Sequence, residues 1–64
     1  MVLIMATYEV LYLGNPIGTY DLSEKNLLSD VQELLKKKKL KINEDMTVEV
    51  IDHIVLITYI PIYG

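Results

Sequence analysis

The chain has 64 residues, of which 52% are apolar, with no cysteine and a formal net charge of −3. This length suits one small domain, residues 1–64, and without cysteine its stability must come from apolar burial rather than from disulfides or zinc–thiolate sites. The acidic balance disfavours nucleic-acid and anionic-membrane surfaces. No apolar run reaches the length of a membrane span or has the basic start of a signal peptide, so we expect a cytoplasmic protein without membrane attachment.

The first predicted element is a strand over about 2–13, in which Tyr8 and Tyr12 share a face because strand side chains alternate. Residues 14–18, Gly-Asn-Pro-Ile-Gly, predict a turn, since proline fixes one turn φ and glycine permits positive φ. A short second strand over about 17–20 is expected to pair back on the first.

An amphipathic helix is predicted over about 22–38. Asp21 as N-cap places Glu24 at the third helical position, which is the spacing of a capping box, and Ser23 is an alternative cap. Apolar residues recur at the helical period and form one stripe: Leu27, Leu28, Val31, Leu34 and Leu35. The helix is therefore expected to cover one face of the sheet.

The C-terminal run Thr47–Ile62 is rich in β-branched and aromatic residues and predicts a central strand over about 47–60. Its alternation changes phase at 51–53, which fits either a bulged or broken strand or a hairpin turning at Asp52-His53. The hairpin would create the buried cross-strand pairs Val50–Val55 and Val48–Ile57. We favour the bulged or broken strand, because Asp-His is a poor pair for a type I′ turn.

These elements predict an α+β fold of order β-β-α-β(β), with a mainly antiparallel sheet and one amphipathic helix packed on one face. The segment Ile54–Ile57 is apolar on both strand faces, so both faces need cover, and Leu56→Ala and Ile57→Ala are expected to be similarly destabilising. One helix covers only one face. The second is expected to meet another chain, with a homodimer favoured. We assign this protein-binding or dimer face to Tyr8, Tyr12, Tyr20, Ile54, Leu56 and Tyr59.

The predicted C-terminal end of the helix is rich in lysine, at Lys36, Lys37, Lys38, Lys39 and Lys41. In an alternative function these lysines contact nucleic-acid phosphates from a dimer. Lysines in a last turn are also stabilised by the helix dipole, and the chain has no arginine for bidentate base recognition. We therefore interpret the lysines as a solvated helix end.

No catalytic or metal-binding pattern stands out. His53 is the only histidine, and its neighbour Asp52 would point to the opposite face of a strand. The nine carboxylates are scattered along the chain and do not form a set of metal ligands. We expect neither an enzyme nor a cofactor.

The expected function is a non-enzymatic protein-binding module that inhibits or modulates another protein. The chain has abundant isoleucine, lysine and tyrosine but no arginine, which indicates an AT-rich genome and fits a phage or other mobile element. An anti-defence role, such as that of an anti-CRISPR protein, belongs to this class. The alternatives are a small dimeric nucleic-acid-binding regulator and a structural oligomer subunit. Met1 and Met5 are alternative starts.

Overall fold

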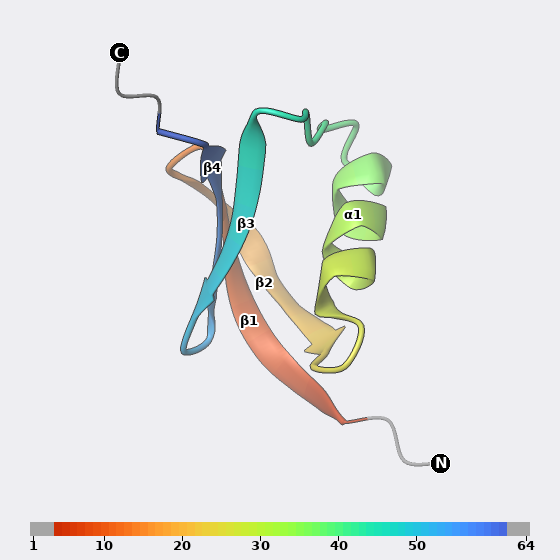
Figure 1. Cartoon of the computed structure of the whole chain (residues 1–64). Helices are drawn as coiled ribbons and strands as arrows, with labels where there is room; N and C mark the ends of the chain where they lie inside the picture. The colour runs from red at the N-terminus through yellow and green to blue at the C-terminus, as the bar shows by residue number, and fades with distance from the viewer. Residues whose placement is uncertain (1–3, 62–64) are drawn as a thin grey trace.

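The computed structural model describes residues 4–61, which form one four-stranded sheet and one helix (Figure 1). The elements follow the order β1 (Met5–Tyr12), β2 (Asn15–Ser23), α1 (Leu27–Lys37), β3 (Met46–Ile51) and β4 (Ile54–Tyr59). The predicted α+β class is confirmed. The parts of the predicted strands at residues 2–3 and of the C-terminal run at residue 62 lie outside the described residues, as does Tyr63.

The sheet consists of two hairpins joined side by side. Its strand order is β2-β1-β4-β3, with β1 antiparallel to β2 and β3 antiparallel to β4. The two central strands, β1 and β4, run parallel. The sheet is therefore mainly antiparallel with one parallel pairing, and β4 takes the central place predicted for the C-terminal run.

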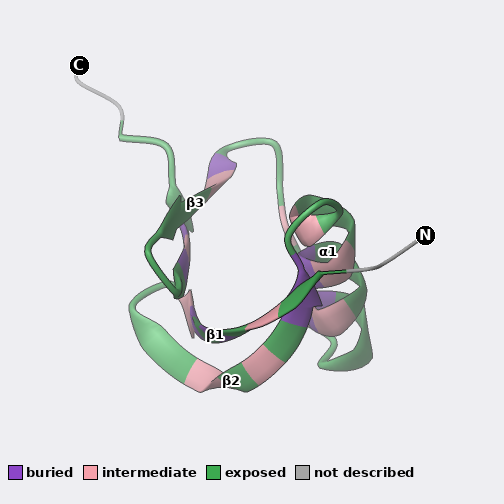
Figure 2. Cartoon of the chain, turned by 90° about the horizontal axis from the view of Figure 1, so that it is seen from below, coloured by how far each residue is buried: buried purple, intermediate pink, exposed green. Residues whose placement is uncertain are grey.

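The hydrophobic core lies between the sheet and α1. Alternate residues of each strand face the helix, because successive strand side chains point to opposite sides. These residues and two from α1 are buried: Tyr8, Val10, Leu22, Val31, Leu35, Met46, Val55 and Ile57. We call this side of the sheet the helix face. Figure 2 shows α1 beside the β1–β2 part of the curved sheet, with β3 on the other side of the molecule.

The preference for a bulged or broken strand at 51–53 was wrong, because β3 and β4 form the alternative, a hairpin. β3 and β4 are joined by Asp52 and His53, and the expected pairs Val50–Val55 and Val48–Ile57 are present. Only Asp52 of the two loop residues has positive φ (53°), whereas a type I′ turn needs positive φ at both. Aspartate tolerates this conformation, so the loop does not need the glycine that a type I′ turn favours.

The first turn is shorter than the predicted 14–18. β1 and β2 are joined by Leu13 and Gly14, which have φ of 51° and 84°, the positive values of a type I′ turn. Pro16 therefore lies inside β2. Next to it the pairing register shifts, and Ile17 is the unpaired extra residue of a bulge.

The helix starts later than predicted. Leu22 and Ser23 belong to β2, where Leu22 pairs with Ala6, so the capping box proposed from Asp21 does not form. Asn26 is the N-cap but makes no side-chain capping bond. Sheet pairing and burial of Leu22, which is 4% exposed, outweigh the local capping preference.

The helix ends in a Schellman motif. The N–H of Leu40 donates to the carbonyl of Leu35 (2.8 Å), and that of Lys39 donates to Lys36 (3.1 Å). Lys39 takes the left-handed conformation, with φ of 60°, that glycine adopts most easily. The motif turns the chain so that Leu40 packs against the core.

Candidate protein-binding surface

Three of the predicted binding residues are tyrosines of the helix face. Tyr8 is buried in the core, and Tyr12 and Tyr20 are partly buried against it. The Tyr12 hydroxyl donates to the carbonyl of Lys41 (2.6 Å), and the Tyr20 hydroxyl donates to that of Ile17 (2.8 Å). These side chains therefore hold the connection after α1 and the β2 bulge to the sheet.

The six predicted residues do not share one face. In the β1–β4 register Val10 lies beside Val55, so Tyr8 and Ile54 point to opposite sides of the sheet. Ile54 and Leu56 lie on the side away from the helix, which we call the open face. Tyr59 falls in the helix-face phase of β4, yet it is 53% exposed because it lies at the strand end.

Four apolar residues form a contiguous patch on the open face. Leu11 of β1 lies beside Leu56 of β4, and Ile54 of β4 pairs with Ile51 of β3. Leu11 and Leu56 are partly buried, whereas Ile54 and Ile51 are 37% and 53% exposed. In the described chain, residues 4–61, no helix covers this side of the sheet. We call Leu11, Ile51, Ile54 and Leu56 the open-face patch.

The border of the open-face patch is acidic. Glu9 lies beside Ile54 in the β1–β4 register, and Glu49 pairs with Leu56 on the other side. Asp21 is further out on β2, where it accepts a hydrogen bond from the Thr7 hydroxyl (2.6 Å). All three carboxylates are exposed.

All basic side chains lie away from this face. The chain has six basic residues, and each is a lysine within or close to α1: Lys25, Lys36, Lys37, Lys38, Lys39 and Lys41. All are exposed. The lysines at the end of the helix are therefore exposed to solvent, as the sequence predicts. One of them, Lys38, also has its ammonium group 5.4 Å from the centre of the Tyr20 ring. The helix thus carries lysines together with Asp30 and Glu33, whereas the charged side chains placed on the open face are all carboxylates.

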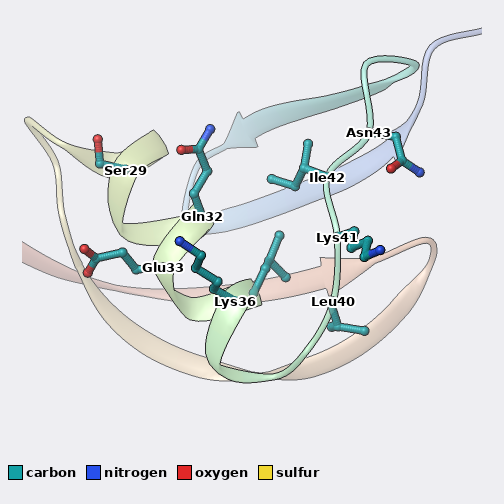
Figure 3. Close-up of a pocket in the computed structure, with 9 residues that line it drawn as sticks. Ser29, Gln32, Glu33, Lys36, Leu40, Lys41, Ile42 and Asn43 are labelled. Carbon is teal, nitrogen blue, oxygen red and sulfur yellow. The ribbon is translucent and has the colours of Figure 1, made fainter.

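A shallow hollow of about 520 Å³ lies between α1 and the connection to β3 (Figure 3). Leu35, Leu40 and Ile42 supply its apolar lining. Polar side chains from both segments surround them, among them Glu33 and Lys36, which Figure 3 shows on the helix. The described polar side chains that line the hollow are all exposed. A ligand site usually has a few polar groups held in place to orient the ligand, so the open face is the stronger candidate for a binding site.

His53 lies exposed in the β3–β4 turn with its ring 5.8 Å from that of Tyr8. Its backbone carbonyl accepts a hydrogen bond from Glu9 (2.8 Å), which holds the turn against β1. Within residues 4–61, no three histidine, aspartate or glutamate side chains are grouped to hold a metal ion. The one described helix is too short and too polar to cross a bilayer.

Sequence reasoning missed Leu11 and Ile51 in the apolar patch, and Glu9 and Glu49 on its border. Strand alternation alone places Glu9 and Leu11 on the side opposite Tyr8. The phase between strands was the missing information, because it decides which residues of β1, β3 and β4 lie together. Comparisons of the chain with protein-family models, curated proteins and solved structures gave no match.

Proposed function

We propose that the protein is a binding module that attaches to a basic region of another protein through the open-face patch. The observation that supports this proposal is the apolar patch across β1, β4 and β3, which no element of residues 4–61 covers and whose charged neighbours in that range are carboxylates. An exposed apolar patch with a polar border is the usual form of a protein-interaction site.

The chemistry of the patch defines the partner. Leu11 and Leu56 offer a central apolar contact, and full burial of one such side chain contributes about 1.5–3 kcal/mol. Glu9 and Glu49 on opposite sides favour lysine or arginine next to the partner's apolar residues. Such charge pairing accelerates encounter and selects the partner more than it adds affinity. Bound in this way, the module inhibits or modulates its partner by covering a basic surface.

The test uses synthetic peptides as probes, one with alternating leucine and lysine and a matched one with leucine and glutamate. We expect the lysine peptide to bind more tightly, as measured by fluorescence anisotropy, and more weakly as salt is added. Leu56→Thr should reduce its affinity about tenfold, because a buried apolar contact is lost.

A matched pair of charge reversals locates the contact. Glu9→Lys should weaken binding of the lysine peptide several-fold, whereas Glu33→Lys, the same change on the exposed side of α1, should have a much smaller effect. Equal effects of the two reversals would show that net charge, and not the open-face patch, governs binding. Equal affinity of the wild-type protein for both peptides would refute the proposal.

The exposed lysines of residues 36–41 support nucleic-acid binding as a second candidate function. This function predicts binding to any DNA duplex at low salt, with log K falling by about 0.9 per phosphate contact for each unit of log salt. Replacing Lys36 and Lys41 by glutamine should remove that binding and leave peptide binding unchanged. Absence of DNA binding at low salt would eliminate this candidate.

A further inference from the structure

The outer edge of β3 has free backbone hydrogen-bonding groups. The N–H of Ile60 donates to the carbonyl of Asp45 (2.7 Å), which makes Met46–Tyr59 a pair without mutual hydrogen bonds. Because the pattern alternates in an antiparallel ladder, the backbone groups of Met46, Val48 and Val50 point away from β4. Among residues 4–61 only Met46 has a further partner there, through its N–H to the carbonyl of Asn43 (3.1 Å).

The opposite edge of the sheet, at β2, is blocked. Pro16 has no N–H to donate, and the bulge at Ile17 interrupts the regular spacing of the strand. The N–H of Ser23 already donates to the carboxylate of Asp30 in α1 (2.8 Å). These are features with which proteins protect edge strands, and β3 has no proline, bulge or lysine.

We propose that two copies of this chain pair through β3, antiparallel and about a two-fold axis at Val48. Val48 then pairs with Val48 of the second copy and Val50 pairs with Met46. Each copy donates two hydrogen bonds, from the N–H groups of Val48 and Val50 to the carbonyls of Val48 and Met46 in the other copy. The result is one continuous eight-stranded sheet, in which the two blocked β2 edges are outermost.

Charge and hydrogen bonding select this register. Pairing centred on Glu49 would place the two Glu49 carboxylates directly opposite each other, which is unfavourable. Pairing centred on Thr47 would leave the backbone groups of Val50 without partners. With the axis at Val48, Thr47 lies opposite Glu49 of the second copy, and all three outward-facing residues take part.

The side chains on the helix face agree with the same register. Val50 is 44% exposed although it belongs to that face. In the pair it lies beside Met46 of the second copy, while the two Val48 side chains meet at the axis. The two-fold axis is perpendicular to the sheet, so both helices lie on one side and both open-face patches on the other. Since each copy carries a net charge of −3, salt should strengthen the pairing by screening repulsion.

The test measures molar mass by sedimentation equilibrium over a wide range of protein concentration. We expect a monomer–dimer equilibrium with no larger species. Thr47→Lys should tighten the dimer several-fold, because the new ammonium lies opposite Glu49 of the other copy, and Thr47→Glu should weaken it several-fold. Thr19→Glu on the far edge strand β2 is the matched control and should leave the equilibrium unchanged.

Hydrogen exchange gives a second measurement that does not depend on a variant folding. The amides of Val48 and Val50 should exchange more slowly as protein concentration rises, whereas that of Thr19 should not change. A monomer at every concentration would overturn the proposal, as would a dimer that responds equally to both Thr47 substitutions. Peptide binding by the open-face patch is measured on monomer at low concentration. A failure of the binding proposal and a failure of the dimer proposal can therefore be told apart.

Discussion

The two hairpins of this small sheet differ in how completely the chain covers them. The β1–β2 hairpin lies beside α1 and buries Val10 and Leu22. At its bulge, the Tyr20 hydroxyl donates a hydrogen bond to the carbonyl of Ile17. The β3–β4 hairpin buries Val55 and Ile57 of β4 but leaves Val50, Ile51 and Tyr59 between 44% and 53% exposed.

This difference suggests that different residues stabilise the fold and contact other molecules. A chain of 64 residues can bury only a small core. Here the core lies between α1 and the helix face of the sheet. Within residues 4–61, the open face and the β3 edge are not covered by a further element, and Val50, Ile51 and Ile54 there stay at least 37% exposed. Substitutions of core residues such as Val10 and Ile57 should therefore affect the free energy of unfolding, whereas those at the open-face patch and the β3 edge should mainly affect association.

The largest expected effect distinguishes two neighbouring residues of β4. Ile57 is fully buried, so Ile57→Ala should reduce the free energy of unfolding by about 2–5 kcal/mol. Leu56 is only partly buried and faces away from the helix, so Leu56→Ala should cost roughly half as much or less. Urea denaturation of dilute protein measures both. Equal losses would mean that the open face is covered within the monomer.

The second prediction makes the same substitution in each hairpin. Val10 is fully buried, so Val10→Thr places a hydroxyl in the core and should cost about 1–3 kcal/mol. Val50→Thr, at a residue 44% exposed, should change stability by no more than about 0.5 kcal/mol. Thermal unfolding at low concentration compares them. A large loss for Val50→Thr would show that β3 is already part of the core.

The smallest expected difference concerns two glycines of the β1–β2 hairpin. At Gly18 (φ 139°) an added Cβ would lie 2.6 Å from the hydroxyl oxygen of Tyr20, so Gly18→Ala should cost roughly 1–3 kcal/mol. At Gly14 (φ 84°) an added Cβ meets no atom within 4 Å, so Gly14→Ala should cost only about 1–2 kcal/mol, the backbone penalty for positive φ. Gly18→Ala should also alter the near-ultraviolet spectrum of Tyr20, and an unchanged spectrum would contradict the close packing.

Sequence periodicity predicted where helix and strands occur better than it predicted where they begin and end or which strands pair. The apolar stripe predicted α1, strand alternation and the turn signal at 14–18 predicted the first hairpin, and the β-branched C-terminal run predicted strand structure but not the hairpin of β3 and β4. The helix start was missed because pairing of Leu22 with Ala6 overrides a local capping pattern. The parallel pairing of β1 with β4 is a long-range choice that no local pattern encodes.

The candidate site was predicted only in part, for the same reason. Ile54 and Leu56 were assigned to a binding face and lie on the open face, and their binding role stays a prediction. The tyrosines were grouped with them by residue type, whereas the register between strands puts Tyr8, Tyr12 and Tyr20 on the helix face. Alternation within one strand shows which of its residues lie on the same side. Only the pairing between strands shows which residues of different strands lie on the same side of the sheet.

The parallel pairing of β1 with β4 also determines how the chain assembles in time. Strands of each hairpin are separated by two residues, and such hairpins form in about 1–10 μs. The contact of Glu9–Tyr12 with Ile54–Ile57 must close a loop containing β2, α1 and β3, with a correspondingly larger entropy cost. We therefore expect this contact to form last and to limit the folding rate. Substitutions within it, and in the hairpin turns that form before it, should therefore slow folding more than they accelerate unfolding.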